Sequence, residues 1–265
     1  MTASMGKTIA EMFGLPHDWR VSMAPQGTVE WLEARRGCIT GSMARVAREK
    51  LKSGEPAKTA ITYAKDTGRA RAGAGDGDEV FVNAAMRFGT EQEPYARRAY
   101  ELRTGYMVEA AGFVCTPDRK FGVSVDGLVY DEPGQRGGIE IKTIVGSNVL
   151  FDAVVDGDIS AYLDQCDMNT WAWVLDWIDL CLWVPDLASE EARLTVIRIP
   201  RNQDRIDALL ADLAQFDKLV ERYADKLRKF EASKKSTPAD TPPWVDAAPA
   251  QTTTAAPVEL TEPAF

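Results

Sequence analysis

The stretch GVSVDGLVYDEPGQRGGIEIK at residues 122–142 decides the fold. One apolar run within it ends at Asp126, and a second run carries Glu140 and Lys142 two positions apart. Because side chains alternate between the two faces of a strand, Glu140 and Lys142 share one face, and the isoleucines beside them point into the core. The segment between the runs has the composition of a turn. The stretch therefore predicts a β-hairpin that brings Asp126 beside Glu140.

Two carboxylates with a lysine close by suit a metal-assisted reaction. Carboxylate oxygens are hard ligands of the kind that Mg²⁺ prefers, and an ammonium group beside them can face an attacking water or a phosphate. The alternative is a ladder of surface salt bridges, since Glu-X-Lys is common on exposed strands. The hairpin alone leaves both interpretations open.

Three further segments carry motifs in a consistent order along the chain. Asp126 with Glu140-Ile141-Lys142 resembles the Asp…Glu-X-Lys signature of the restriction-endonuclease-like, or PD-(D/E)XK, nuclease superfamily. The further segments resemble motifs of the phage lambda exonuclease and YqaJ-type viral recombinase family: WLEARRGCITGS at 31–42, FGTEQEPYARRAY at 88–100 and YLDQCDMNTWAW at 162–173. The resemblance spans roughly residues 28–230. The chain departs from the family at Val125, where the family commonly has proline, and valine still permits an extended backbone.

The resemblance implies an α/β (α+β) fold with a restriction-endonuclease-like core, in which helices flank a central mixed β-sheet. It also implies a Mg²⁺-dependent DNA exonuclease of phage-type recombination, which degrades the 5′ strand of linear double-stranded DNA and leaves 3′ single strands for annealing. Members of the family act as ring-shaped trimers with single-strand annealing proteins, so a homotrimer and such a partner are expected. Two other classes stay open: an endonuclease directed by DNA structure or sequence, and a catalytically silent DNA-binding scaffold for recombination.

Two Mg²⁺ ions are expected in the site, and Mn²⁺ is expected to substitute for them. Asp126 would bind both ions and Glu140 one, with the backbone carbonyl of Ile141 as a further ligand. Lys142 would orient or deprotonate the attacking water. The resemblance makes Glu93 an additional acidic ligand, although Thr-Glu-Gln-Glu at residues 90–93 also fits a capping box at a helix N-terminus.

The resemblance assigns the DNA 5′-phosphate to Arg35, Ser42 and Ser124. A guanidinium fork and hydroxyl groups suit a dianionic terminal phosphate. Arg36 remains an alternative to Arg35 as the phosphate ligand. Gln165 would contact the scissile phosphate or orient the nucleophile, with Tyr162 beside it. The alternative role for this pair is helix packing.

Composition bounds the class of protein. The chain has 265 residues with 45% apolar composition, which is enough for one substantial core. Its four cysteines are scattered, so neither a zinc site nor a disulfide framework is expected, and the clustered cysteines of iron–sulfur nucleases are absent. No apolar run is long enough to span a membrane. The simplest interpretation is a cytoplasmic protein, in the host cell if the gene is carried by a phage.

The formal net charge is −9, but the charge is unevenly distributed and one stretch is basic. Residues 35–72 contain ten Lys and Arg against three acidic residues. Such a stretch can bind DNA phosphates while an acidic exterior keeps the protein soluble. The alternative is a solvated helix face followed by a loop.

The expected organisation is a leader at 1–27, a nuclease domain at 28–232 and a disordered Pro-, Thr- and Ala-rich tail at 233–265. The apolar pattern predicts strands at 107–115, 120–130, 138–145, 177–184 and 194–199. It predicts helices at 28–36, from Ser42 onward, and at 90–103, 158–175 and 204–231, with a glycine-rich loop at 66–78.

Overall fold

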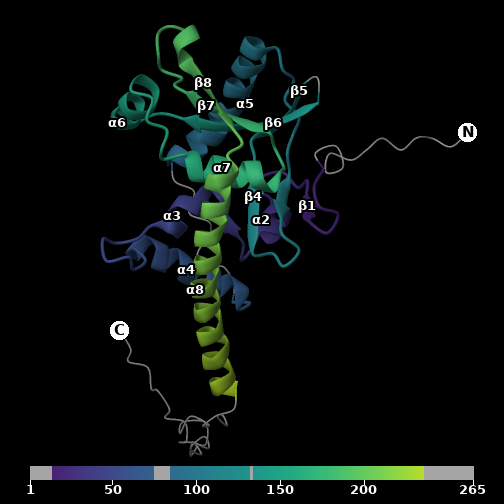
Figure 1. Cartoon of the computed structure of the whole chain (residues 1–265), viewed down its shortest axis with the longest axis vertical. Helices are drawn as coiled ribbons and strands as arrows, with labels where there is room; N and C mark the ends of the chain where they lie inside the picture. The colour runs from purple at the N-terminus through teal and green to yellow at the C-terminus, as the bar shows by residue number, and fades with distance from the viewer. Residues whose placement is uncertain (1–13, 75–83, 132–133, 236–265) are drawn as a thin grey trace, which may run out of the picture.

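The computed structural model describes residues 14–74, 84–131 and 134–235. These residues form two four-stranded β-sheets with helices around them, and one long helix extends from the body of the molecule (Figure 1). The first residues of the expected leader and nearly all of the expected tail lie outside the described residues. Within the described part, no helix is long and apolar enough to cross a membrane.

The hairpin sheet is the sheet that contains the decisive hairpin. Its strands lie in the order β5 (Gly127–Asp131), β6 (Gln135–Thr143), β7 (Trp177–Trp183) and β8 (Leu194–Pro200). β5 pairs antiparallel with β6, with Gly127 opposite Ile139, while β6 runs parallel to β7 and β7 antiparallel to β8. The expected hairpin and the expected mixed sheet are both confirmed.

Two helices cover opposite faces of the hairpin sheet. α5 (Ala84–Thr104) packs on one face and α7 (Leu163–Ala172) on the other. The side chains of β7 alternate accordingly: Trp177, Cys181 and Trp183 pack with α5, whereas Ile178, Leu180 and Leu182 pack with Cys166 of α7. Ile139 and Ile141 of β6 also belong to the α5 side. Glu140 and Lys142 therefore face α7, as the period-two pattern predicts.

The second sheet corrects two expectations. Its strands lie in the order β1 (Arg20–Ser22), β3 (Phe113–Cys115), β4 (Phe121–Ser124) and β2 (Ile39–Thr40). The single strand expected at 120–130 is instead two strands, β4 and β5, which belong to different sheets. The chain changes sheets at Asp126, whose side chain accepts the Ile141 N–H at the end of the ladder. Residues 20–22, expected in a leader, pair with β3.

The long helix α8 (Gln203–Lys235) extends beyond the body of the molecule (Figure 1). Its apolar stripe packs against α4 (Lys58–Arg71), and the two backbones approach closely because Gly68 has no side chain. The loop expected at 66–78 is therefore wrong for residues 66–71, which complete α4 against α8.

The remaining helices are short. They are α2 (Val29–Arg35), η1 (Gly41–Met43), α3 (Ala44–Arg48), α6 (Ser147–Val149), the π-helix η2 (Leu150–Val155) and η3 (Glu191–Arg193). Ser42 lies within η1 and does not cap α3. The helix expected at 158–175 is regular only across α7.

The capping box expected at residues 90–93 is wrong. α5 begins at Ala84, so Thr90 and Glu93 lie inside the helix, and so does Pro94. The Thr90 hydroxyl donates to the Met86 carbonyl oxygen one turn earlier, a bond that threonine makes within helices. Glu93 is thereby free of a capping role.

Gly137 provides a test of the packing around the hairpin. A Cβ atom at Gly137 would lie 2.2 Å from two ring atoms of Trp177, which crosses it from the neighbouring strand. We expect Gly137→Ala to destabilise the protein by about 1–3 kcal/mol, because overpacking forces the indole and the strand apart. Urea unfolding measures the loss. Gly146→Ala is the control, since nothing lies within 4 Å of a Cβ there, and equal stabilities of the two variants would contradict this packing.

Candidate active site

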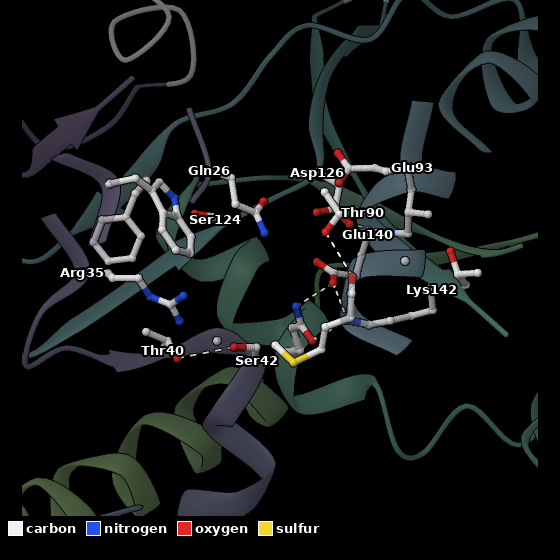
Figure 2. A pocket seen from close by; sticks show the side chains of 18 residues that line it. Gln26, Arg35, Thr40, Ser42, Thr90, Glu93, Ser124, Asp126, Glu140 and Lys142 are labelled. Atoms are coloured by element: carbon white, nitrogen blue, oxygen red, sulfur yellow. Dashed lines mark hydrogen bonds and ion pairs between the residues drawn. The ribbon is translucent and has the colours of Figure 1, made fainter. Parts of the chain in front are cut away.

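A cleft of about 400 Å³ opens beside the end of the hairpin (Figure 2). Acidic residues and Lys142 line one end, and Arg35 lies with hydroxyl side chains at the other (Figure 2). The cleft brings together residues of both sheets, α2, η1, α5 and α7. The residues assigned by sequence that line it are Arg35, Ser42, Glu93, Ser124, Asp126, Glu140, Ile141, Lys142 and Gln165.

Asp126 lies just past the end of the β5–β6 ladder. The last pair of the ladder is Gly127 with Ile139, and Asp126 comes directly before Gly127. The Asp126 N–H donates to the Ile139 carbonyl oxygen at 3.1 Å, and the Ile141 N–H donates to Asp126 Oδ2 at 2.6 Å. The Ile141 amide therefore faces Asp126 rather than β7. Both carboxylates are held by backbone geometry that the hairpin fixes.

Glu140 is almost completely buried, with 2% of its surface exposed, and nitrogen donors surround it. Its Oε1 accepts from Lys142 Nζ at 2.8 Å and from Gln165 Nε2 at 2.5 Å. Its Oε2 accepts from Asn169 Nδ2 at 2.7 Å. Lys142 Nζ also donates to Gln165 Oε1 at 3.0 Å, so these side chains form one connected network.

The acidic end of the cleft concentrates negative charge. Burial, followed by the charges of Glu140 and Glu93, raises the pKa of Asp126 well above its ordinary value. Burial also raises the pKa of Glu93, and Glu140 adds to the shift. Burial alone would lower the pKa of Lys142, but Glu140 and Asp126 outweigh it and raise that pKa. Such a site favours an additional cation.

The donor chemistry fits a hard divalent cation, although the carboxylates are not gathered around a single point. Among the described residues, no group of three or more His, Cys, Asp or Glu side chains is arranged to hold a metal ion. Glu140 in particular has both oxygens engaged by nitrogen donors. The oxygens of Glu93, Asp126 and Glu140 are nevertheless the ligands that Mg²⁺ prefers, and the charge they share would be relieved by it.

Arg97 also belongs to the acidic end, although no sequence motif assigned it to the site. Its guanidinium lies 3.6 Å from Glu93 and also donates to the Asp126 carbonyl oxygen. The spacing of four residues between Glu93 and Arg97 on one helix was the available signal. Asn169 was not assigned either, although it follows Gln165 by one helical turn.

The other end of the cleft is suited to an anion. The Arg35 guanidinium lies 4.3 Å from the centroid of the Trp31 ring, and burial lowers its pKa. No carboxylate among the described residues forms an ion pair with it. Ser42 Oγ lies 3.4 Å from Thr40 Oγ1, and the buried Ser124 Oγ has no hydrogen-bond partner in the described part of the chain. Arg36, by contrast, is paired with Glu33 at 2.7 Å and does not line the cleft.

Tyr162 and most basic side chains of residues 35–72 lie elsewhere than the sequence predicted. Tyr162 does not line the cleft; it precedes α7 and packs against the apolar cluster around Ile144. Much of the basic stretch at 35–72 is neutralised within the protein: Arg48 pairs with Asp164 and Asp212, Lys50 with Asp212, and Arg71 with Asp217 and Glu221. Arg35 is the basic residue of this stretch that lines the cleft among the described residues.

Known structures share this fold. An alkaline exonuclease from Laribacter hongkongensis is 29% identical, with a TM-score of 0.65 over 79% of this chain and 100% of that chain. The same exonuclease in complex with dAMP gives a TM-score of 0.66 over 78% and 100%. A phage-related exonuclease from Haemophilus somnus shares the fold at 16% identity, with a TM-score of 0.55 over 73% and 96%.

A search of curated proteins found no significant match. The family is shown instead by a match to a family model. Residues 30–172, more than half of the chain, match the YqaJ-like viral recombinase domain. This span contains both ends of the cleft, from Arg35 to Gln165. The chain therefore belongs to the YqaJ-like viral recombinase family.

Proposed function

We propose that the protein is a Mg²⁺-dependent exonuclease that degrades the 5′ strand of linear double-stranded DNA and leaves 3′ single strands for annealing. One observation carries the proposal: a single cleft joins the Asp126–Glu140–Lys142 group to the Arg35–Ser42 group. The first group suits phosphodiester hydrolysis and the second suits a terminal phosphate. Two of the structural relatives are named as exonucleases, which agrees with this assignment.

The chemistry follows from the charges at the acidic end. Mg²⁺ ions held by Glu93, Asp126, Glu140 and the Ile141 carbonyl would activate a water and neutralise charge on the reacting phosphate. Lys142 would orient or deprotonate the attacking water and offset charge on the phosphate. Gln165 bridges Lys142 and Glu140 and orients both toward the cleft.

The anion end supports a preference for 5′-phosphorylated ends. Arg35 provides a partly buried guanidinium without an acidic partner among the described residues, and Ser42 and Ser124 add hydroxyl groups. The Laribacter exonuclease binds dAMP, which is the kind of mononucleotide that digestion of a 5′ strand would release. The proposal also includes a homotrimer and a single-strand annealing partner, on the strength of the family alone.

Asp126→Asn tests the metal-dependent chemistry. We expect it to reduce hydrolysis of linear duplex DNA more than about a hundredfold, since even residues that only support a metal ligand contribute 10–100-fold. Lys142→Ala should also abolish cleavage. Activity is measured with Mg²⁺, with Mn²⁺ and in EDTA. Undiminished activity in EDTA, or in the Asp126→Asn variant, would overturn the proposal.

The same Asp126→Asn variant should be more stable than the wild type in EDTA. The folded state raises the pKa of Asp126. The folded protein therefore loses stability as the pH rises from the unfolded-state pKa of about 4 to the higher folded-state pKa. The neutral amide avoids this penalty and can still accept the Ile141 N–H. We expect a rise in melting temperature of about 3 °C or more at neutral pH. Asp225→Asn, at an exposed ion pair on α8, should change little.

Arg35→Ala and Arg36→Ala form a matched pair for the anion end. Arg35→Ala should reduce the preference for 5′-phosphorylated over 5′-hydroxyl ends by about tenfold or more, because a hydrogen bond to a charged group contributes about 1.5–3 kcal/mol. Arg36→Ala should leave the preference unchanged, because Arg36 is paired with Glu33 outside the cleft. Rates on the two kinds of end measure the effect. Equal rates on both ends in the wild type would refute this assignment.

A further inference from the structure

Glu140 is held by two amide side chains from the same helix. Gln165 and Asn169 lie one turn apart on α7, and each donates to a different oxygen of the Glu140 carboxylate. Gln165 lines the cleft, whereas Asn169 is fully buried behind the carboxylate. The two amides therefore donate hydrogen bonds to Glu140 from the cleft side and from the interior.

The two oxygens of Glu140 consequently differ in their surroundings. Oε1 accepts from Lys142 and Gln165, which both border the cleft. Oε2 contacts Asn169, whose side chain no substrate can reach because it is 0% exposed. The Asn169 hydrogen bond thus fixes the carboxylate with Oε1 toward the cleft.

The orientation of the Asn169 amide follows from its partner. An ionised carboxylate only accepts hydrogen bonds, so Nδ2 must face Glu140 and Oδ1 must point away. Oδ1 is buried and has no hydrogen-bond partner in the described part of the chain. It lies 3.1 Å from the position that a Cβ atom on Gly41 would occupy, so the glycine beside Ser42 leaves room for the amide.

Asn169 combines one hydrogen bond to the buried Glu140 carboxylate with a buried oxygen that has no partner among the described residues. A buried carbonyl oxygen without a partner lowers stability, and an apolar side chain would suit the surroundings of α7, where Met168, Ala172 and Trp173 pack into the core. What Asn169 provides that an apolar residue lacks is its N–H group on Glu140. Its contribution is therefore to the carboxylate.

We propose that Asn169 is a positioning residue for catalysis: it anchors Oε2 of Glu140 so that the carboxylate is held at the cleft, where it would bind a metal ion. This inference rests on the proposed function. It separates Asn169 from Gln165, which contacts the cleft directly. It also predicts that loss of Asn169 impairs metal binding and the chemical step but not DNA binding.

The test compares Asn169→Ala and Asn169→Leu with Thr170→Val. The leucine variant keeps the branched shape of asparagine but removes the donor. Thr170 is the matched control, because it is buried on the same helix and donates only to the Cys166 carbonyl oxygen of its own helix. Melting temperatures establish that each variant is folded. If the alanine variant does not fold, the leucine variant carries the test.

Three quantities are measured: Mn²⁺ affinity by electron paramagnetic resonance, duplex affinity in EDTA by fluorescence anisotropy, and the single-turnover rate of hydrolysis. Both Asn169 variants should weaken Mn²⁺ binding and slow hydrolysis by about 10–100-fold, with duplex affinity within about twofold of wild type. Thr170→Val should match the wild type in all three.

The outcomes separate the inference from the proposed function. Asn169 variants that bind Mn²⁺ as tightly as Thr170→Val would overturn the positioning role, whatever their activity. A wild-type protein that binds Mn²⁺ but does not hydrolyse DNA would overturn the proposed function, while the Mn²⁺ affinities would still decide the role of Asn169. A parallel loss of duplex affinity in the Asn169 variants would also contradict the inference, because it would indicate general damage to the cleft.

Discussion

The antiparallel pairing of β5 with β6 is the constraint on which the active cleft depends. It sets Gly127 opposite Ile139, so Asp126 lies just past the end of the ladder, beside β6 and near Glu140. A shift of one residue would turn every side chain of β6 to the other face, burying Lys142 against α5 and directing an isoleucine toward α7. The hydrogen bond from the Ile141 N–H to Asp126 then fixes the carboxylate where β5 ends. The register is thus a condition of the chemistry as well as of the fold.

The sequence contained the signals for the hairpin and for the faces of its strands, because these depend on local alternation. It could not reveal that the chain changes sheets at Asp126, since β4 and β5 together read as one apolar run. The start of α5 was misplaced because a plausible capping box lies within that helix. Asn169 and Arg97 could have been noticed by their helical spacing, but only the tertiary structure shows which groups they touch.

The cleft also shows how tertiary structure distinguishes neighbouring residues of the same type. Arg35 and Arg36 are equivalent by sequence, yet one lies over Trp31 in the cleft and the other pairs with Glu33. At the opposite end, burial of Asp126, followed by the charges of Glu140 and Glu93, raises its pKa, which reduces stability at neutral pH. Proteins commonly retain such unfavourable charge where activity requires it. The buried Ser124 oxygen without a partner among the described residues lines the cleft, and the Asn169 oxygen without such a partner lies behind Glu140, so both fit the same pattern.

The most direct test of the central claim follows the fate of each strand of a linear duplex. Substrates labelled at either the 5′ or the 3′ end, together with a closed circular duplex, are incubated with the wild-type protein in Mg²⁺ or in EDTA. The account predicts release of mononucleotides from the 5′ label in Mg²⁺, late release of the 3′ label, and no cleavage of the circle or in EDTA. Early release from the 3′ end, or efficient cutting of closed circular DNA, would contradict it.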